Sequence, residues 1–503
     1  MQSVAGLVRQ AASNGQEASL ALAESMFRLY DIRGDTQTDL TDDAAYGIGQ
    51  AYVQLWHERK GPGAPTVAVG RDVRPTSYAL RQALAEGIMS LGGTVLDIGV
   101  VPTPVLYYAL FTTAVDGGIM ITGSHNPARY NGMKIAMGHD MVWGPELQRL
   151  AQLAQGCPAP AGKTGTTSAH ALLPRYVEDL AQRFGAGILG APGRPSLRVV
   201  VDCGNGCAGL AMPTLVDRLG IECTFLYVEL DGTFPNHHPD PTIPATLEGL
   251  RDKVQSEHAD FGIAFDGDVD RIGVVDEQGR VVWGDKLTYL YAADIIRHMA
   301  CGAEPVRVIG EVKCSKALFD GVEQLGGIAV MSATGHSIIK QVMRDQHAQL
   351  AGEMSGHIFF ADRYYGYDDA IYAALRLMEL FVDRRNTTPG LIFSDLLRDL
   401  PTMVTSPEIR RPCLDEQKVG LVAGFMSAFR SLYPDLAQQA VKVVNIDGVR
   451  IEWVDGWGLV RASNTEPLLV LRFEAETETR MLDIQTAFEK TLSSLAVTNG
   501  GRR

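Results

Sequence analysis

The sequence lacks the features that mark secreted and membrane-spanning proteins. Its seven cysteines are odd in number, form no C-x-x-C pair and show no metal-site spacing. We therefore expect reduced thiols and a cytoplasmic location, because disulfides persist in oxidising compartments. No apolar run is long enough to cross a bilayer. Residues 1–23 lack the continuous apolar stretch of a secretory signal. The apolar residues from Ala18 to Phe27 have helical spacing, and we interpret the N-terminal segment as a partly disordered tail that leads into a helix.

Positive charge is scarce as well. The 503 residues include 45 Lys and Arg against 59 Asp and Glu, which gives a net charge of −14. Nucleic acid and anionic membranes require basic patches, so neither is expected as a partner. Any site for a phosphorylated ligand must therefore gather its cations locally, against the overall charge. The length also exceeds what one hydrophobic core supports, which predicts two to four domains.

Short β-branched runs alternate with helical patterns along the chain. Residues 66–70 and 93–98 have the pattern of strands, and residues 80–91 and 102–110 have that of helices. This alternation predicts α/β layers with largely parallel sheets. The last hundred residues change character, and their strand-like runs before a final helical pattern predict a small α+β domain.

Two segments have the pattern of copies of one unit. Residues 116–124 align without gaps on residues 260–268, and both open with Asp-x-Gly-Ile before a buried strand. Gly123 and Gly267 occupy the same place in the loops that follow. In open α/β sheets, ligands gather at the carboxyl ends of strands. The repeat therefore predicts tandem domains that each present a functional loop.

The first of these loops contains Thr122-Gly-Ser-His-Asn-Pro127 and is followed by Asn131-Gly-Met-Lys134. A serine placed after a buried strand can be reached by a reactant, although it needs a partner group to act as a nucleophile. Ser, Asn, Pro and Gly also form ordinary turns, so the motif alone leaves that alternative open.

The second loop, Asp266-Gly-Asp-Val-Asp-Arg271, places three carboxylates at alternate positions. They would repel one another unless a hard cation such as Mg²⁺ held them, and that cation would keep positions open for a phosphate oxygen. An EF-hand is rejected, because its sixth position requires Gly and Arg271 stands there. An aspartyl-phosphate enzyme of the haloacid-dehalogenase type also fits, with Asp266 as nucleophile and Asp268 as acid/base. The residue that carries phosphate, Asp266 or Ser124, distinguishes these two enzymes.

Two further motifs are polar. Gly352-Glu-Met-Ser-Gly-His357 points Glu353 and Ser355 the same way if extended, where they can bind neighbouring sugar hydroxyls. Arg461-Ala-Ser-Asn-Thr465 offers guanidinium, hydroxyl and backbone N–H donors to a phosphate dianion. Each motif also fits an ordinary polar turn.

Gly204-Asn-Gly-Cys-Ala-Gly209 matches a dinucleotide-binding pattern, but no acidic residue follows at the usual offset, and we interpret it as a tight turn.

Together, and in this order, the four motifs resemble the α-D-phosphohexomutase superfamily, and most closely its bacterial phosphomannomutase/phosphoglucomutase branch. The resemblance extends from Tyr30 to the C-terminal helix. It includes Tyr30-Asp-Ile-Arg-Gly34, Gly70-Arg-Asp72, the Pro-rich residues 234–241 and Thr334-Gly-His336. Four motifs in the family's order are far more specific than any one of them.

The resemblance implies an α/β fold of four domains around a central cleft, with three related mixed-sheet α/β domains and a C-terminal α+β lid. The expected parts are an N-terminal extension at 1–25, domain 1 with the phosphoserine loop at 26–165, domain 2 with the metal-binding loop at 166–280, domain 3 with the sugar-binding loop at 281–395, and domain 4 with the phosphate-binding loop at 396–503.

The resemblance also implies roles for individual residues. Ser124 would be the phosphoserine, and its phosphate would share Mg²⁺ with Asp266, Asp268 and Asp270. The other catalytic residues would be Arg33, His125, Lys134, Arg271 and His336. Substrate binding would involve Lys313, Thr334, Gly335, Glu353, Ser355, His357, Arg461, Ser463, Asn464 and Thr465. We name Lys134 and His336 as acid/base candidates, Lys134 on condition that neighbouring cations depress its pKa.

The implied reaction interconverts hexose 1-phosphate and hexose 6-phosphate through a hexose 1,6-bisphosphate, which serves as intermediate and activator. Met354 favours the mannose/glucose branch, since phosphoglucosamine mutases usually have Gln there. The alternatives are a phosphoglucosamine mutase and an aspartyl-phosphate phosphatase or mutase that uses Asp266. We expect a phosphosugar as the only partner and a monomer or weak homodimer. A silent regulator with this fold is disfavoured, because no motif residue is missing.

Overall fold

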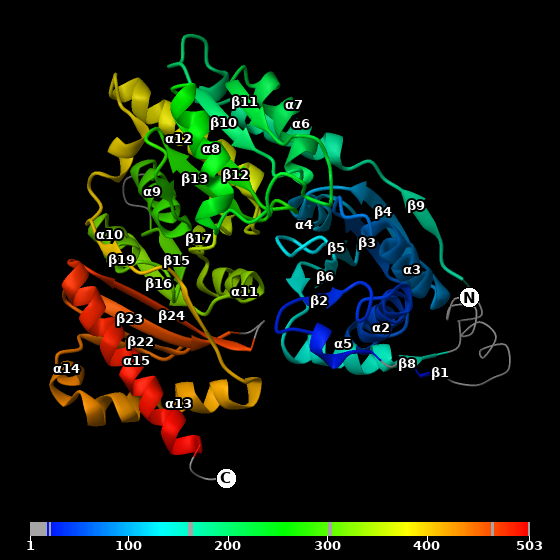
Figure 1. The fold of residues 1–503 in the computed structure, drawn as a ribbon. Helices are drawn as coiled ribbons and strands as arrows, with labels where there is room; N and C mark the ends of the chain where they lie inside the picture. The colour runs from blue at the N-terminus through cyan, green and yellow to red at the C-terminus, as the bar shows by residue number, and fades with distance from the viewer. Residues whose placement is uncertain (1–17, 20–21, 159–163, 300–303, 464–466, 501–503) are drawn as a thin grey trace. The chain divides into compact units, whose positions relative to one another are not determined.

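The computed structural model describes all residues except 1–17, 20–21, 159–163, 300–303, 464–466 and 501–503 (Figure 1). The chain divides into two compact units. The first comprises Met1–Gly284 and Ser355–Asp395, and the second comprises Asp285–Met354 and Leu396–Arg503. The chain therefore leaves the first unit after Gly284 and returns to it at Ser355. Among the described helices, none combines the length and the apolar character needed to cross a membrane.

The first unit opens with a mixed sheet in the order β2-β6-β5-β3-β4-β9, with β7 paired to β6. Its strands are β2 (Ile32–Asp35), β3 (Thr66–Arg71), β4 (Thr94–Val100), β5 (Gly117–Ile121), β6 (Tyr130–Met137), β7 (Asp140–Met141) and β9 (Thr167–Ala169). Its helices are α2 (Asp42–Lys60), α3 (Ser77–Ser90), α4 (Thr103–Thr112) and α5 (Pro145–Gln155). Side chains of α2, α3, α5, β3 and β5 share one core that contains Ile48, Leu84, Leu150, Val69 and Ile121.

Helix α2 shows how the sequence sets the ends and the packing of an element. The hydroxyl of Thr41 accepts a hydrogen bond from the N–H of Ala44, and Gly61, with φ of +85°, ends the helix. Glycines then let α2 and α3 approach at backbone distance. A Cβ atom added at Gly49 would lie 2.3 Å from the carbonyl of Leu84, and one added at Gly87 would lie 2.1 Å from that of Tyr46. These two positions therefore accept no larger residue without a shift of the helices.

The second sheet of the first unit has the order β11-β10-β12-β13-β14. Its strands are β10 (Arg198–Asp202), β11 (Glu222–Leu226), β12 (Phe261–Phe265), β13 (Ile272–Asp276) and β14 (Val281–Val282). Its neighbours are α6 (Leu173–Gly185), α7 (Met212–Arg218) and α8 (Glu248–Ser256), together with α12 (Ala370–Thr387) of the returning segment, which also contains β18 (Ile358–Phe360). The G-x-G-x-x-G segment forms a turn after β10 that leads into a short 3₁₀ helix at Cys207–Leu210.

The second unit contains a parallel set and an antiparallel sheet. β15 (Arg307–Glu311) pairs in parallel with β16 (Ile328–Ser332) and β17 (Leu350–Gly352). The helices of this part are α9 (Gly284–Arg297), α10 (Lys316–Gln324) and α11 (His336–Gln346). The antiparallel sheet has the order β19-β24-β23-β22-β21, with β20 also paired to β24. Its strands are β19 (Val404–Thr405), β20 (Ile409–Pro412), β21 (Lys442–Val444), β22 (Val449–Trp453), β23 (Gly456–Ala462) and β24 (Leu468–Ala475).

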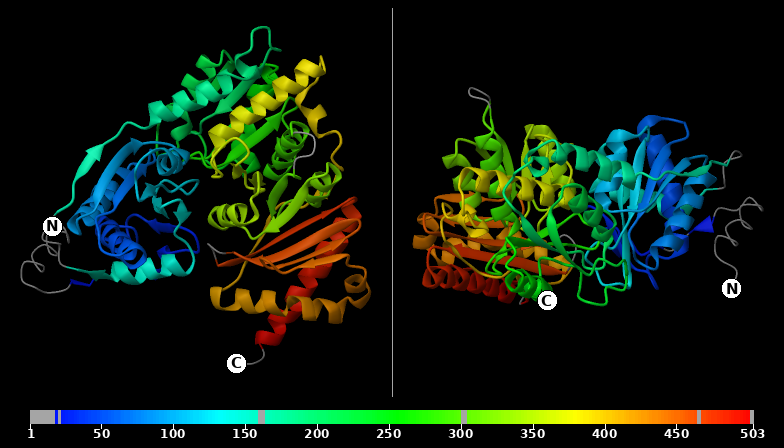
Figure 2. Two further views of the ribbon diagram at one scale, coloured as in Figure 1. Left: turned by 180° about the vertical axis from the view of Figure 1, so that it is seen from behind. Right: turned by 90° about the horizontal axis from the view of Figure 1, so that it is seen from above.

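Helices cover one face of this antiparallel sheet, and a polar junction covers the other. α13 (Asp415–Leu432) and α15 (Glu478–Gly500) lie on the same face, next to the short α14 (Pro434–Gln438) (Figures 1 and 2). Phe425 and Phe488 pack together in the core beneath them. On the opposite face, the Arg450 guanidinium lies 3.8 Å above the Trp457 ring and donates to the carbonyl of Val312. The C-terminal sheet is thereby anchored to the segment after β15.

Three sheets repeat one arrangement of strands. In β4-β3-β5, β11-β10-β12 and β16-β15-β17, the first strand along the chain lies in the centre, with the second and third strands on either side of it. All these pairings are parallel. β5 and β12 are the two strands that the sequence repeat identified. The expectation of related α/β units is therefore confirmed.

The N-terminal region differs from its prediction. Instead of a helix near residues 18–27, β1 (Ala18–Ser19) pairs with β8 (Gly156–Cys157), and a single 3₁₀ turn spans Glu24–Met26. Met26 and Phe27 are buried in the core of the first sheet. The apolar side chains of Met26 and Phe27 therefore attach this region to the core from a 3₁₀ turn and the residue after it.

Candidate active site

The serine loop follows β5 and holds Ser124 in an unusual backbone conformation. Ser124 has φ of +47°, its N–H donates to the hydroxyl of Thr122 at 2.8 Å, and it is almost fully buried. Its Oγ donates to Asp266 Oδ2 at 2.7 Å and lies 3.1 Å from His125 Nδ1. A carboxylate and an imidazole therefore lie next to the one hydroxyl that the sequence proposed as nucleophile.

The aspartate loop between β12 and β13 brings three carboxylates together. Ligand atoms of Asp266, Asp268 and Asp270 all lie within 4.8 Å of one another, and the three residues are buried. The loop turns at Val269, which has φ of +69°. Asp266 Oδ1 accepts the backbone N–H groups of Asp270 and Arg271. The alternate positions of the sequence thus converge on one point.

Burial and mutual repulsion act unequally on the three acids. Burial, and then the charges of Asp270 and Asp268, raises the pKa of Asp266 well above its ordinary value. Burial also disfavours ionisation of Asp268, but Lys134 and hydrogen bonds outweigh it and lower the pKa to about 2. The pKa of Asp270 is lowered as well, because Lys134 outweighs burial. Asp266 is therefore the carboxyl whose ionisation is most disfavoured by the clustering of the three acids.

The donor set fits a hard divalent cation. Within the described part of the chain, Asp268 Oδ1 and Asp270 Oδ1 are buried and have no hydrogen-bond partner. Carboxylate oxygens are the ligands that Mg²⁺ prefers, and a buried carboxylate oxygen without a partner is costly. A divalent cation would add to the positive charge that Lys134, Arg33 and Arg271 already bring to the three carboxylates.

Lys134 corrects one expectation. Its ammonium lies 2.7 Å from Asp268 Oδ2 and also contacts Asp270. Burial alone would lower its pKa, but the two carboxylates outweigh burial and raise the pKa above the ordinary value. The expected depression by neighbouring cations is wrong, because the nearest charges are negative. Lys134 therefore stays protonated at neutral pH in this arrangement.

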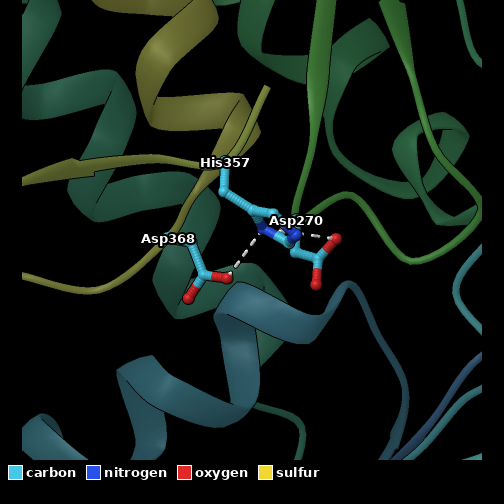
Figure 3. A group of neighbouring side chains, drawn as sticks. All are labelled: Asp270, His357 and Asp368. Atoms are coloured by element: carbon cyan, nitrogen blue, oxygen red, sulfur yellow. Dashed lines mark hydrogen bonds and ion pairs between the residues drawn. The ribbon is translucent and has the colours of Figure 1, made fainter. Parts of the chain in front are cut away.

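Figure 3 shows a second polar group beside the aspartate loop. His357 Nδ1 lies 3.1 Å from Asp368 Oδ2 and 3.8 Å from Asp270 Oδ1. The Nε–H of Arg271 donates to His357 Nε2 at 3.0 Å. Because the Arg271 nitrogen always carries its hydrogen, Nε2 accepts, and the imidazole proton belongs on Nδ1, facing Asp368. Asp368 therefore fixes the tautomer and the orientation of the ring.

A carboxylate in the second unit organises the segments expected to bind sugar. Glu311 Oε2 accepts the Thr334 hydroxyl at 2.6 Å, and Glu311 Oε1 accepts the N–H of Met354 at 3.3 Å. Lys313 Nζ lies 3.7 Å from Glu311 Oε1, and Gly335 N–H donates to Glu353 Oε1 at 3.0 Å. Burial raises the pKa of Glu311, and Lys313 opposes that shift. Three separate segments therefore meet at one buried acid.

The phosphate motif lies at the end of β23. The Nε–H of Arg461 donates to Asp447 Oδ2 at 2.9 Å, and the same oxygen accepts the N–H of Thr334 at 3.1 Å. Lys418 Nζ donates to the carbonyl of Ser463 at 2.7 Å. Asn464 and Thr465, the other two predicted residues of this motif, lie outside the described residues.

Comparison with known proteins identifies the family. Profiles of the phosphoglucomutase/phosphomannomutase family match most of the chain in order, with α/β/α domain I at 24–155, domain II at 174–279, domain III at 283–400 and the C-terminal domain at 408–491. The chain belongs to this family. The four-domain α/β fold expected from the motifs is thereby confirmed, and the chain is a mutase.

Individual relatives agree with the profiles. The mutase is 41% identical over 475 residues to a phosphomannomutase/phosphoglucomutase of Pseudomonas aeruginosa, an alignment that covers 94% of this chain and 96% of the relative. It is 38% identical to a phosphoglucomutase of Neisseria meningitidis, with 94% and 98% covered. A crystal structure of a phosphoglucomutase/phosphomannomutase family protein from Burkholderia thailandensis has a TM-score of 0.82 at 36% identity, with 94% and 98% covered.

The predicted site residues of the mutase fall into two groups. The first unit contains Ser124, His125, Arg33, Lys134, Arg271, His357 and the three aspartates, and Arg33 joins them by donating to the carbonyl of Thr122 at 2.9 Å. The second unit contains Lys313, Thr334, Gly335, His336, Glu353, Arg461 and Ser463. Ser355 belongs to the first unit, as the first residue of the segment that returns to it.

Sequence reasoning missed four polar residues that hold these groups in place. They are Arg74, Glu311, Asp368 and Asp447. Only Arg74 had a nearby signal, since it follows the motif Gly70-Arg-Asp72 by two positions. The other three depend on partners that no local pattern reveals.

Replacement of Asp266 by Asn tests the electrostatic interpretation of the aspartate loop. Because its pKa is raised in the folded protein, Asp266 destabilises the metal-free mutase increasingly as pH rises above about 4. Metal-free Asp266→Asn should therefore be more stable than the parent at pH 7. Mg²⁺ at one hundred times its Kd should stabilise the parent by about 2.7 kcal/mol and leave the variant unchanged. Thermal unfolding in EDTA and in MgCl₂ measures both effects.

Asp97→Asn is the matched control for this experiment. Asp97 forms an ion pair with Arg81 away from the aspartate loop. This variant should keep the full response to Mg²⁺. An equal Mg²⁺ response in Asp266→Asn would show that the cation binds elsewhere.

Proposed function

We propose that this mutase interconverts hexose 1-phosphate and hexose 6-phosphate, with mannose and glucose as its sugars. The observation that carries the proposal is the 2.7 Å hydrogen bond from Ser124 Oγ to Asp266, the first of three clustered, buried carboxylates. The names of the relatives support the choice of sugars, since one is a phosphomannomutase/phosphoglucomutase and another a phosphoglucomutase.

The reaction starts from phosphorylated Ser124. The bond between Oγ and phosphorus breaks while the free hydroxyl of a hexose phosphate bonds to phosphorus, and the hydroxyl proton passes to a base. The resulting 1,6-bisphosphate then presents its other phosphate to Ser124. In the second transfer the Ser124 oxygen accepts that phosphoryl group, and the sugar oxygen regains a proton. The phosphoserine is regenerated, and the phosphate has changed ends.

The metal ion and the cationic side chains would have separate tasks. Asp266, Asp268, Asp270 and the phosphate on Ser124 would hold Mg²⁺, which would stabilise charge on the moving phosphoryl oxygens. Arg33 and Lys134 add fixed positive charge on the same side of the serine loop. Preorganised charges of this kind stabilise a transition state without reorganising.

We assign the proton transfer to His357 rather than to Lys134. In the metal-free protein the carboxylates of Asp268 and Asp270 raise the pKa of Lys134, which favours the protonated form and makes Lys134 a poor acceptor of the hydroxyl proton. The bond from Arg271 implies an unprotonated Nε2 on His357, and Asp368 supports the ring from the other side. Nε2 would accept the hydroxyl proton once the sugar hydroxyl takes the place of the Arg271 N–H. His336, which begins α11 in the second unit, is the remaining candidate from the sequence.

Recognition of the sugar and of the distant phosphate belongs to the second group of residues. Glu353 and Ser355 would bind two sugar hydroxyls, while Lys313, Thr334 and Gly335 complete the surrounding segment. Arg461, Ser463, Asn464 and Thr465 would bind the phosphate that is not reacting. A phosphoglucosamine mutase and an aspartyl-phosphate enzyme using Asp266 are the alternatives. The cytoplasmic location and the monomeric or weakly dimeric state stay predictions.

The site of phosphorylation decides between serine and aspartate chemistry. After incubation with glucose 1,6-bisphosphate, Ser124 should carry an acid-stable phosphate ester, located by mass spectrometry of peptides. Ser124→Ala should lose the phosphate and at least about 10⁴-fold in turnover, since nucleophile and intermediate are both lost. A hydroxylamine-sensitive phosphate on Asp266, retained in Ser124→Ala, would instead establish an acyl phosphate.

Replacement of His357 tests the acid/base assignment. His357→Ala should lower kcat by about 10² to 10⁴-fold, which is the usual contribution of a positioned general base, and should change KM little. His57→Ala provides the control, because this ring contacts the carbonyl of Gly63 and the neighbouring Trp56 ring at the surface. Near-full turnover of His357→Ala together with loss in His336→Ala would transfer the role to His336.

Comparison of three sugar phosphates tests the substrate class. Mannose 1-phosphate and glucose 1-phosphate differ only at C2, which neither Glu353 nor Ser355 is expected to contact. Their kcat/KM values should therefore lie within about tenfold of each other, because no contact worth more than about 1.4 kcal/mol separates them. Glu353→Gln should lower both by a similar factor. Turnover of glucosamine 6-phosphate alone would identify a phosphoglucosamine mutase.

A further inference from the structure

Arg74 lies beneath the serine loop and uses every N–H of its guanidinium. One N–H donates to Asp72 Oδ2 at 3.1 Å. The other four donate to backbone carbonyls of the serine loop, which are those of Ser124 at 2.8 Å, Pro127 at 2.8 Å, Tyr130 at 2.9 Å and Asn126. A guanidinium has five N–H donors in a rigid plane, so this set is complete.

Asp72 fixes Arg74 from the opposite side. Its Oδ1 accepts the N–H of Arg74 at 3.0 Å and the hydroxyl of Ser77 at 2.5 Å, at the start of α3. Its Oδ2 also accepts the N–H of Gly123 at 3.1 Å. Asp72 and Arg74 are 3% and 2% exposed, so water does not compete for these bonds. The ion pair therefore ties the end of β3 to both ends of the serine loop's turn.

The conformation of Ser124 requires such support. A φ of +47° places a non-glycine residue in the left-handed region, a strained conformation that persists only where the surroundings enforce it. Arg74 binds the carbonyl of Ser124 itself. A Cβ atom on Gly123 would lie 2.5 Å from the guanidinium carbon, so the loop rests directly on Arg74. The ring of Phe234 covers the guanidinium at 5.0 Å.

We propose that Arg74 is the positioning residue that holds Ser124 in its left-handed conformation, with Oγ directed at the aspartate loop, for both phosphoryl transfers. Arg74 acts through backbone carbonyls and makes no contact with the reacting groups. This inference rests on the proposed function of Ser124 and identifies the residue that orients its hydroxyl. The complete set of five donors explains why Lys, with one ammonium, cannot replace Arg here.

Arg74→Ala and Arg74→Lys are the test variants, and Arg81→Lys is the matched control. Arg81 lies on α3 and forms an ion pair with one aspartate, as Arg74 does. It makes no bond to the serine loop. Both Arg74 variants should lower kcat by about 100-fold, the expected effect of roughly 1 Å of misplacement, and leave KM unchanged. Arg81→Lys should keep the parental kcat. Steady-state assays with added glucose 1,6-bisphosphate measure these values.

Two further readouts separate positioning from a general loss of stability. Hydrogen exchange of the amides in residues 122–131 should become faster in both Arg74 variants, while exchange in the aspartate loop and the Mg²⁺-dependent shift in thermal unfolding stay unchanged. Low millimolar guanidinium should partly restore kcat of Arg74→Ala, whereas equal concentrations of urea or NaCl should not. A residue needed only for stability would show neither the local change nor the rescue.

The proposal is overturned if a folded Arg74 variant keeps kcat within about twofold of the parent, or if Arg81→Lys loses as much activity. It is also overturned if exchange in the serine loop is unchanged. Where Arg74→Ala does not fold, Arg74→Lys decides by the same criteria. Failure of the proposed function would appear separately, as absence of phosphate on Ser124 in the parent protein.

Discussion

Three carboxylates held within 4.8 Å of one another in a buried loop are the constraint on which the rest of the site depends. Buried like charges at this distance are unstable unless cations balance them. The protein supplies one cation itself, since Lys134 contacts Asp268 and Asp270. Arg271 adds a further positive charge near Asp266, but burial and the charges of Asp270 and Asp268 still raise the pKa of Asp266 well above its ordinary value when no metal ion is bound. The hydroxyl of Ser124 lies against that same carboxylate, so one side chain links the proposed nucleophile to the proposed metal site.

This arrangement follows from a repeated fold. In the first unit, β5 and β12 occupy equivalent central positions, each parallel to one neighbour and antiparallel to the next. The abrupt change of direction after each strand forces a tight loop, and both loops contain a non-glycine residue with positive φ, at Ser124 and Val269. The repeat thus brings a nucleophile loop and a metal loop to the ends of equivalent strands, where backbone N–H groups can hold Asp266.

Much of this could be predicted from the sequence, because it depends on local patterns. Buried strands followed by Gly-rich polar loops identified the serine and aspartate motifs, and their order identified the family. The contacts that could not be predicted are non-local. Lys134 meets Asp268, which lies 134 residues further along the chain, so the sign of its pKa shift was wrong. Glu311 and Asp368 lack any motif, and the apolar spacing near Phe27 resembled a helix because periodicity does not distinguish anchoring side chains from a helical face.

The two units use polar residues in different ways, and the difference matches the proposed reaction. Around Ser124 the bonds are saturated, since Arg74 has no donor left and Asp72 accepts four hydrogen bonds. A phosphoryl transfer that is repeated at two ends of a sugar needs one reacting group in one fixed geometry. Recognition has the opposite requirement, because the sugar must bind in two orientations. The second unit has hydroxyls, backbone N–H groups and long cationic side chains arranged around Glu311 and Asp447. In the proposed reaction such groups would accept a phosphate or a hydroxyl without defining which carbon carries it. Rigid chemistry and permissive recognition are therefore separate properties of this chain, each with its own buried acid at the centre.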